Sequence, residues 1–441
     1  MKNICVIGLG YIGLPTAAMF ARCGFQVTGV DINQKITQMI ATGKAHIQEP
    51  GLAELVQQVV SNGRLRTQLI PEAADAFIIA VQTPFSENDT SVPGNNKRAD
   101  MRFVISAAES ILPYLQPGNL VVLESTSPPR TTVDLIVPIL ERSGLAAGRD
   151  FYLAYTPERV LPGQILKELV EDARVIGGID AASARAGADL YRSFVQGEII
   201  ETDATTAEMV KLMENTSRDI NIAIANEFSQ LAERFGISIW EAIEIANKHP
   251  RIKILKPGPG VGGHCISVDP WFLVEAAPDD TPLIQAARLV NDSQPGHVIQ
   301  SISDLVGELE GKQIALLGLA YKENVDDLRE SPAVEIALKL VARNAIVKAY
   351  EPNKPDFHLP GASVYAEIAP VISTADLIVV LVRHQEVISL DPYDLAKITP
   401  ARLVYDAIHA WDSAIWRQAG FDVRFLGASA SNLPIHDNRR V

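Results

Sequence analysis

The sequence predicts an α/β protein in which two doubly wound domains are joined by a central helical part with one long helix. Two observations predict this fold. A pattern of strand, glycine loop, helix, strand and acidic residue opens the chain and returns in weaker form after residue 310. Between the two copies, apolar residues recur at helical spacing from about Thr205 to Phe235. We expect domains at residues 1–202, 203–309 and 310–441.

Composition limits the class of protein. The 441 residues are enough for two or three domains, and 47% apolar with 21% charged residues is the balance of a globular protein. No apolar run approaches the roughly 18 residues of a membrane helix, and the N-terminus enters an apolar strand without room for a signal peptide. Three cysteines fit a reducing cytoplasm. A net charge of −14 disfavours nucleic acid as a partner. We therefore expect a cytoplasmic protein with no nucleic-acid or membrane partner.

The first domain is predicted to alternate strands and helices. Strands are expected at residues 4–7, 25–30, 76–81, 120–123, 151–155 and 174–176. A helical pattern follows the first strand, from Gly13 to about Cys23, and others lie between later strands. This alternation is typical of a mostly parallel sheet that is covered by helices on both faces.

The central part is predominantly helical. The long helix ends at Gly236, and its apolar positions include Met209, Leu212, Met213, Ile220, Ile224 and Phe228. A second helix is expected at about residues 239–247, and more helix up to about Leu309. The segment KPGPGVGGHC, residues 256–265, is too rich in glycine and proline to be helical.

The third domain repeats the opening pattern. A strand at residues 313–317 meets Gly318, as the first strand meets Gly8. A second strand at 346–350 leads to Glu351, as its counterpart leads to Asp31, and a third is expected at 377–382. We interpret this part as a second doubly wound domain.

The glycine loop of the first domain has the full context of a Rossmann-type dinucleotide site. Gly8 makes the tight turn, Gly10 admits a pyrophosphate, and Gly13 permits close helix packing. Asp31 would accept hydrogen bonds from a ribose and repel a 2′-phosphate, which favours NAD over NADP. A doubly wound domain that binds another nucleotide, or none, is the alternative. The expected cofactor contacts here are Gly8, Gly10, Tyr11, Ile12, Gly13 and Asp31.

The corresponding loop of the third, Rossmann-like domain departs from this fingerprint. Only Gly318 is retained, and Lys322 stands nearby. The loop cannot admit a pyrophosphate closely, but it offers a cation where a phosphate would lie, which suits a different nucleotide. A degenerate copy with a surface lysine explains the same residues equally well.

The three cysteines fall into two kinds. Cys5 and Cys23 lie on apolar faces of a strand and a helix, and we interpret both as small core residues. Cys265 follows two glycines and a histidine in a loop, and Asp269 comes soon after. A cysteine displayed beside ionisable groups is a candidate nucleophile, and a loop cysteine of no consequence is the alternative. No CxxC partner or paired histidines are present, so no metal is expected.

Seven longer motifs run along nearly the whole chain. They are VIGLGYIGLP, VQTP, LESTSP, YTPERVLPG, KLMENTSRDINIAIANE, GPGVGGHCISVDPWF and GLAYKENVDDLRESP. Together they resemble the nucleotide-sugar 6-dehydrogenase family, which includes the UDP-glucose and GDP-mannose dehydrogenases. ERVLPGQ, NTSRDINIAIANE and HPRIKIL are most similar to the branch that acts on UDP-N-acetyl-D-mannosamine. The resemblance implies an NAD-dependent enzyme for this UDP-sugar, with UDP-N-acetylglucosamine and UDP-glucose as alternative substrates.

The resemblance assigns catalytic roles. Lys211 and Asn215 share a helix face; spacing alone favours a solvated surface, whereas the resemblance makes them the pair that polarises oxygen at the sugar's C6. Cys265 matches the catalytic thiol, and Asp269 matches the carboxylate that positions or activates water. Further expected catalytic residues, which line the reaction site, are Glu158 and Thr126. Further expected cofactor contacts are Thr83, Thr126 and Arg329, and expected substrate contacts are Glu158, Arg159, Val160, Lys211, Asn215, Arg251, Gly262 and Lys322.

The implied mechanism removes four electrons from C6. The alcohol becomes an aldehyde, the Cys265 thiolate captures it as a thiohemiacetal, and a second oxidation leaves a thioester that water hydrolyses to the uronic acid. Oxyanion stabilisation by Lys211 and Asn215 is typically worth about 3 kcal/mol per donor. A two-electron hydroxyacid dehydrogenase, which would not need Cys265, and an NAD-sensing regulator without turnover are the alternatives from other classes.

Two features depart from the family pattern. Pro129-Arg130 follows LESTSP where the family usually has a glycine. The polar stretch Ser86 to Asp100 is longer than expected, which fits either a mobile lid or an exposed loop.

Self-association is expected from the long helix. Its apolar positions exceed what one small central domain should bury, so we expect a homodimer built on this helix. The resemblance then implies that Arg251 reaches the substrate of the neighbouring subunit.

Overall fold

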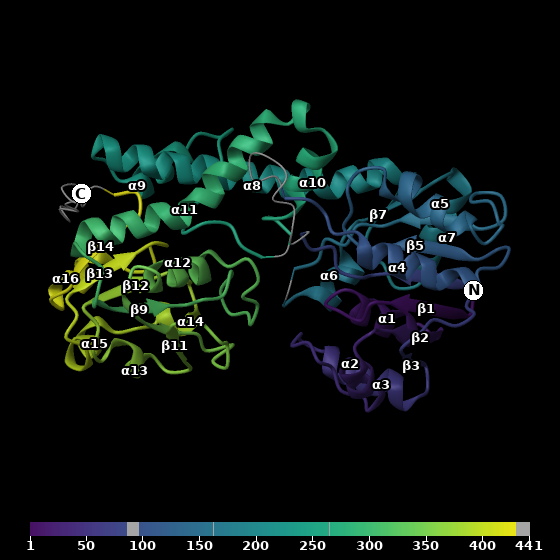
Figure 1. The fold of residues 1–441 in the computed structure, drawn as a ribbon, viewed down its shortest axis with the longest axis horizontal. Coiled ribbons are helices and arrows are strands. Elements are labelled where there is room, and N and C mark those ends of the chain that lie inside the picture. The colour runs from purple at the N-terminus through teal and green to yellow at the C-terminus, as the bar shows by residue number, and fades with distance from the viewer. Residues whose placement is uncertain (86–96, 162, 264, 429–441) are drawn as a thin grey trace. The chain divides into compact units, whose positions relative to one another are not determined.

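The computed structural model describes residues 1–85, 97–161, 163–263 and 265–428. These residues form two compact units (Figure 1), one of Met1–Glu214 with Trp271–Asp280 and one of Asn215–Pro270 with Thr281–Val441, here called unit 1 and unit 2. The domain boundaries after residues 202 and 309 stay a prediction. Most of the long polar stretch, residues 86–96, lies outside the described residues. Its flanks, Phe85 and Ala99, pair in an isolated antiparallel bridge.

Unit 1 contains an eight-stranded sheet in the order β3-β2-β1-β4-β5-β6-β7-β8. Its strands are β1 (Asn3–Ile7), β2 (Gln26–Val30), β3 (Leu65–Gln68), β4 (Ala76–Ile79), β5 (Leu120–Leu123), β6 (Tyr152–Tyr155), β7 (Arg174–Gly178) and β8 (Ile199–Asp203). Neighbouring strands are parallel, except that β7 runs antiparallel to β6. The chain order changes direction between β1 and β4, which is the switch point where doubly wound sheets bind ligands.

Helices cover both faces of this sheet. They are α1 (Gly13–Arg22), α2 (Gln34–Ala41), α3 (Leu52–Ser61), α4 (Arg102–Ile111), η1 (Leu112–Tyr114), η2 (Thr131–Ile136), α5 (Val137–Glu141), α6 (Ile165–Glu171) and α7 (Ala181–Tyr191). Side chains of β1 alternate between two apolar clusters, with Ile4 and Val6 in one and Cys5 and Ile7 in the other. Because both faces of the inner strands are buried, these strands are largely apolar runs, which is why they could be predicted, unlike the edge strands β3 and β8.

Unit 2 contains a six-stranded, fully parallel sheet in the order β11-β10-β9-β12-β13-β14. The strands are β9 (Gln313–Leu317), β10 (Ile346–Tyr350), β11 (Ala362–Tyr365), β12 (Leu377–Val380), β13 (Leu403–Asp406) and β14 (Asp422–Phe425). This order repeats that of β1 to β6, which confirms the predicted second doubly wound fold. Its helices are α9 (Ile239–Ala246), α11 (Pro282–Val306), α12 (Pro332–Val341), α13 (Ile368–Ile372), α14 (Gln385–Ile388), α15 (Pro392–Ile398) and α16 (Ser413–Gln418).

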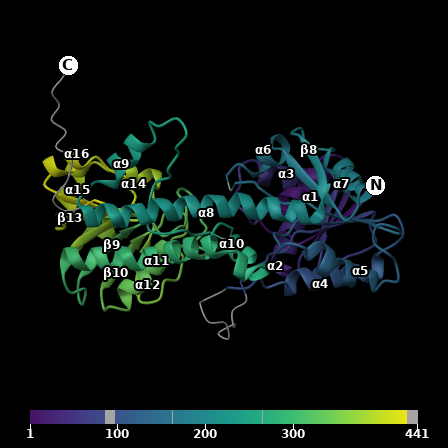
Figure 2. The same ribbon diagram turned by 90° about the horizontal axis from the view of Figure 1, so that it is seen from above.

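The predicted long helix is α8 (Ala204–Phe235), a single helix that passes from unit 1 into unit 2 (Figure 2). Two short helices, α10 (Asp269–Ala276) and η3 (Pro278–Asp280), follow the glycine-rich segment. None of the helices in the described ranges combines the length and the apolar character needed to cross a membrane.

One sequence interpretation is wrong at Cys23. Cys5 is buried in β1, and burial raises the pKa of its thiol to about 12, as expected of a core cysteine. Cys23 is exposed because α1 ends at Arg22 and the chain turns outward through Gly24, whose φ is +97°. The Cys23 thiol donates to the Ser193 carbonyl at 3.2 Å.

A buried polar ladder joins α8 to α11 within unit 2. Arg288 Nη1 lies 2.5 Å from Asp219 Oδ1, and Asn291 donates to the same oxygen at 2.8 Å. Asn291 in turn accepts from Asn226, whose side-chain oxygen accepts from the Gly258 amide at 3.0 Å. Burial raises the pKa of Asp219 to about 6, although Arg288 opposes this. The ladder thereby ties the segment that leads to Cys265 to the two helices.

Replacing Arg288 by Ala should lower the free energy of unfolding by about 3–5 kcal/mol at pH 8, because the ionised Asp219 is left buried without its counter-ion. Chemical denaturation of the Arg288→Ala variant measures the loss. The double variant Asp219→Asn with Arg288→Met removes both charges and should recover much of the stability. Equal stability of Arg288→Ala and the wild type would show that the pair contributes nothing.

Candidate active site

The loop after β1 has the geometry that a pyrophosphate needs. Gly8 adopts a φ of +93°, and a Cβ added there would lie 2.5 Å from the Ala80 carbonyl oxygen. A Cβ on Gly13 would lie 1.8 Å from the Gly8 oxygen, so α1 can approach β1 only with glycine at this position. A Cβ on Gly10 would meet no atom within 4 Å, which leaves its backbone accessible.

The same loop fits NAD in its charge and its hydrogen bonds. Helix α1 has no side-chain cap at its N-terminus and no acidic residue in its first turn, so its field is available to an anion. Asp31 Oδ2 accepts from the Leu9 amide at 3.0 Å, and Oδ1 accepts from the Asn33 amide at 2.8 Å. Each carboxylate oxygen keeps a lone pair for a ribose hydroxyl. Tyr11 and Ile12 complete the turn into α1, as the glycine fingerprint predicts.

Two further loops meet at the switch point of unit 1. Ser125, after β5, donates its hydroxyl to the Val81 carbonyl, after β4, at 2.7 Å. The half-buried Thr126 and Thr83 lie on these two loops. The structure thus brings together the two segments that were expected near the nicotinamide.

The departure at Arg130 has a structural explanation. Arg130 adopts a φ of +72°, a conformation that favours glycine, immediately before the π-helical turn η2. The buried Glu208 of α8 accepts from the Arg130 amide at 2.6 Å and from the Thr132 amide at 2.7 Å. Burial raises the pKa of Glu208, and these hydrogen bonds oppose the rise. Glu208 therefore ties the loop to the turn of α8 that carries Lys211.

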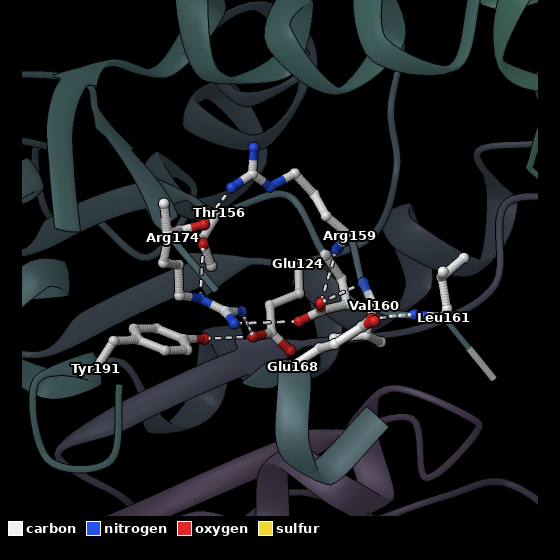
Figure 3. A network of polar contacts seen from close by, with 10 residues as sticks. Glu124, Thr156, Arg159, Val160, Leu161, Glu168, Arg174 and Tyr191 are labelled. Atoms are coloured by element: carbon white, nitrogen blue, oxygen red, sulfur yellow. Dashed lines mark hydrogen bonds and ion pairs between the residues drawn. The ribbon is translucent and has the colours of Figure 1, made fainter. Parts of the chain in front are cut away.

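Glu158 is held by its own loop. Its Oε1 accepts from the Arg159 and Val160 amides at 2.7 and 3.0 Å, and its Oε2 accepts from Arg174 at 3.1 Å. The Arg159 guanidinium, seen in Figure 3, donates to Glu214 at 2.6 Å and to the Ala173 carbonyl. Val160 is half-buried.

The segment that leads to Cys265 packs against the loop between β9 and α12 in unit 2. The Gly263 amide donates to the Arg329 carbonyl at 3.1 Å. A Cβ on Gly262 would lie 2.7 Å from the Glu330 oxygen, and one on Gly263 would lie 2.8 Å from the Tyr321 ring. The glycines are therefore required for packing. The partly exposed Cys265 accepts at its carbonyl from the Val268 and Asp269 amides, at 3.0 and 2.8 Å.

Two of the expected reaction residues, Asn215 and Asp269, are connected within unit 2. Asn215 Nδ2 donates to Asp269 Oδ2 at 2.5 Å, and Asp269 is almost fully buried. Lys211 lies one helical turn before Asn215 and is 7% exposed. A side-chain ammonium so deeply buried usually has a partner. Across the described ranges, no hydrogen bond or ion pair is formed by Lys211, which suits a group that awaits a substrate oxygen.

In unit 2, amides of the loop after β9, which corresponds to the glycine loop of unit 1, are hydrogen-bonded to a side chain of the protein. Glu351 Oε2 accepts from the Leu319 and Ala320 amides at 2.9 and 2.8 Å and pairs with His384 Nε2 at 3.2 Å. Burial disfavours ionisation of Glu351, but these hydrogen bonds outweigh it and lower its pKa. The half-buried Lys322 lies on the same loop.

Two expected site arginines lie on the surface of unit 2. Arg329 is held by Asp327 through two hydrogen bonds of 2.9 and 2.7 Å. Arg251 is exposed, as a residue that reaches another subunit would have to be.

Sequence reasoning missed Glu124, Arg174, Tyr191, Glu208 and the pair Glu351–His384. A charged residue at the end of an apolar strand was the available indication for Glu124 and Arg174. Nothing in the sequence indicated that they meet.

Comparison with known proteins matches one family along the chain. The UDP-glucose/GDP-mannose dehydrogenase family matches by its NAD binding domain at residues 2–195, its central domain at 205–293 and its UDP binding domain at 315–413. The chain belongs to this family. It is therefore an oxidoreductase of the nucleotide-sugar dehydrogenase class, with the family's NAD binding and UDP binding domains.

Named relatives cover almost the whole chain. The UDP-N-acetyl-D-mannosamine dehydrogenase of Methanococcus maripaludis is 46% identical over 435 residues, 98% of each protein. The solved structure of the UDP-D-ManNAc dehydrogenase from Pyrococcus horikoshii is 40% identical with a TM-score of 0.87, covering 97% of this chain and 99% of that one. The NDP-N-acetyl-D-galactosaminuronic acid dehydrogenase of Ralstonia solanacearum is 45% identical over 93% of this chain and 97% of its own.

The backbone of Arg130 predicts the order of stability of two variants. Arg130→Gly should melt above Arg130→Ala by roughly 2–4 °C, because only glycine relieves the positive φ while both variants lose the exposed ion pair with Asp134. Differential scanning calorimetry measures the difference. Equal melting temperatures would show that the backbone at residue 130 is not strained.

Proposed function

We propose that this enzyme oxidises UDP-N-acetyl-D-mannosamine to UDP-N-acetyl-D-mannosaminuronate, with two NAD per sugar and Cys265 as the nucleophile. The hydrogen bond between Asn215 and Asp269 carries the proposal. It joins an amide donor on α8 to a carboxylate on the turn that begins at Cys265. A hydroxyacid dehydrogenase or an NAD sensor would have no use for this combination of thiol, carboxylate and amide.

The chain's own residues have distinct tasks in this reaction. NAD, when bound, accepts a hydride in each of the two oxidations. Asn215 has a second amide hydrogen that is not used by Asp269, and with the Lys211 ammonium it stabilises negative charge on the C6 oxygen. Cys265 Sγ bonds to C6 of the aldehyde, which holds it between the oxidations. Asp269 positions the water that hydrolyses the thioester and restores the thiolate.

The residues around the reaction centre hold the cofactor and the substrate. Gly8, Gly10, Gly13 and Asp31 hold NAD at the switch point of unit 1, with Thr83 and Thr126 toward the nicotinamide. Glu158 with its loop and Gly262 line the sugar, and Lys322 takes the diphosphate end. Arg329 closes the cofactor site. The fit of the glycine loop to a pyrophosphate supports this assignment.

The identity of the sugar rests on relatives. Two of them are named for UDP-N-acetyl-mannosamine, which supports the proposed substrate. A third, equally similar, is named an NDP-N-acetyl-D-galactosaminuronic acid dehydrogenase. An N-acetylated sugar is common to these names, so we place UDP-glucose behind the N-acetylated substrates.

We further propose a homodimer through α8. Ile224, Phe228, Leu231 and Phe235 lie along one face of the helix, and their exposed fractions are 41, 41, 39 and 71%. A contiguous apolar stripe of this kind is typical of a protein–protein interface. Arg251 then contacts the substrate of the other subunit.

Two NADH should form for each UDP-N-acetylmannosamine when the sugar is limiting, because the thioester route removes four electrons before release. NADH absorbance counts them, with UDP-N-acetylglucosamine, UDP-N-acetylgalactosamine and UDP-glucose in parallel. Preference for another sugar would overturn the specificity but keep the mechanism. One NADH per sugar would mean that the aldehyde is released.

The Cys265→Ala variant tests whether Cys265 is the nucleophile in this reaction. It should lose more than about 10³-fold in kcat, since the covalent step is removed. Cys5→Ala changes a buried thiol away from the proposed chemistry and is the matched control. Full turnover by Cys265→Ala would favour the two-electron alternative.

Replacing Phe228 by Glu should convert the dimer to a monomer, because a charge would be buried in the apolar interface. Light scattering coupled to size exclusion measures the mass. Leu338, on α12, is 39% exposed and serves as a matched position, so Leu338→Glu should stay dimeric. A wild-type protein that is monomeric at working concentrations would contradict both the dimer and the role of Arg251.

A further inference from the structure

Arg174 bridges two buried carboxylates of unit 1. Its Nη2 lies 2.7 Å from Glu124 Oε1, and its Nη1 lies 3.1 Å from Glu158 Oε2. The Tyr191 hydroxyl donates to the same Glu124 oxygen at 2.6 Å, and the Arg174 guanidinium lies 4.3 Å from the centre of the Tyr191 ring. Figure 3 shows Glu124, Arg174 and Tyr191 pointing toward one another.

The reversal of β7 creates this cluster. Because β7 runs antiparallel to β6, with Tyr155 opposite Gly177, its first residue lies at the edge of the sheet where β5 and β6 end. Glu124 directly follows β5, and Glu158 follows β6. A parallel β7 would put Arg174 at the opposite edge. The arginine thus meets both loops that lead into the reaction site.

The charges of this cluster do not cancel. The side chains of Glu124, Arg174 and Glu158 are 0, 6 and 8% exposed. Two carboxylates and one guanidinium leave one uncompensated negative charge, and a buried charge without a partner is costly. Protonation of one of the two carboxylates removes this uncompensated charge.

Glu124 is the member that holds this proton. Its Oε2 is buried and makes no hydrogen bond of standard geometry with a described residue, although the Thr16 hydroxyl of α1 is close enough to favour the ionised form. Burial raises the pKa of Glu124 to about 7; Arg174 from β7 opposes the rise, Glu158 adds to it, and Tyr191 from α7 opposes it. Glu158, in contrast, accepts hydrogen bonds from two backbone amides, those of Arg159 and Val160, in addition to Arg174.

Glu124 also connects the two sides of the reaction site. The next residue, Ser125, ties its loop to Val81, and Thr126 follows. On the other side, Arg174 reaches Thr156 at 3.1 Å as well as Glu158, so it fixes the start of the loop that is proposed to line the sugar.

We propose that Glu124 is a positioning residue whose protonation state sets how firmly Arg174 holds Glu158. When Glu124 is neutral, Arg174 forms its ion pair with Glu158 alone, and the loop that carries Glu158 is held in place. When Glu124 is ionised, it competes for Arg174 and the hold on Glu158 weakens. The role in turnover rests on the proposed function, whereas the protonation of Glu124 does not.

Infrared spectroscopy tests the proton without any substrate. The difference between wild-type and Glu124→Gln spectra should contain a carboxylic-acid carbonyl band at pH 6 that fades toward pH 8. The subtraction removes other buried acids, such as Asp219 and Asp406, which both variants share. A difference spectrum without this band at pH 6 would overturn the proposal.

The pH dependence of kcat/KM tests the positioning role. In the wild type, kcat/KM should change from one plateau to another in a step near pH 7. Glu124→Gln, which mimics the neutral acid, should lack this step and keep the kcat/KM that the wild type has at low pH. Tyr191→Phe removes a donor that stabilises ionised Glu124, so its step should move up by roughly 0.5–1 pH unit. Tyr405→Phe, which removes a buried hydroxyl of unit 2, should leave the step unchanged.

The outcomes separate the two levels of the proposal. A Glu124→Gln enzyme that keeps the wild-type step overturns the positioning role, even if the infrared band is present. If Glu124→Gln does not fold, the shift in Tyr191→Phe decides, and an unshifted step counts against the proposal. Absence of turnover with every UDP-sugar overturns the proposed function, and the infrared band still decides the protonation of Glu124.

Discussion

The cost of burying charge is the constraint on which both units depend. In unit 1, Arg174 serves two carboxylates that would otherwise stand unpaired at the ends of β5 and β6. In unit 2, Arg288 compensates Asp219 between α8 and α11. Each cluster holds a segment of the proposed reaction site, the Glu158 loop in one case and, through Asn226 and Gly258, the approach to Cys265 in the other. Buried networks of hydrogen bonds and ion pairs of this kind hold loops that have too few apolar residues to be held by packing.

The two doubly wound sheets show how one fold supports two kinds of site. At the first switch point, the short Asp31 binds one loop amide and leaves the backbone of Gly10 open. At the second, the longer Glu351 accepts hydrogen bonds from two loop amides, those of Leu319 and Ala320, so neither amide is available to a phosphate. One additional methylene group thus separates a dinucleotide loop from a closed one. Binding at the second sheet then depends on other groups, such as Lys322.

Local patterns allowed most of the fold to be predicted, and distant pairings could not be. Buried parallel strands are apolar runs, and the glycines at positions 8, 10 and 13 have a fixed spacing, so β1, β2, β4, β5, β6 and the cofactor loop could be found. The short edge strands β3 and β8 carry mixed residues and were missed. Cys23 was misplaced because the helix pattern did not show that α1 ends at Arg22, so that Cys23 lies just beyond the helix. Arg174 could not be joined to Glu124, because their contact depends on the reversal of β7.

The path of the chain between the two units has a consequence for synthesis. Unit 1 includes Trp271–Asp280, which is separated from the rest of that unit by Asn215–Pro270. The ribosome therefore cannot release a complete unit 1 until the residues of unit 2 up to Pro270 have already emerged. Since domains generally fold in the order of their translation, Trp271–Asp280 can join unit 1 only after the first part of unit 2 has been made. Neither unit can be expressed alone from one uninterrupted stretch of gene.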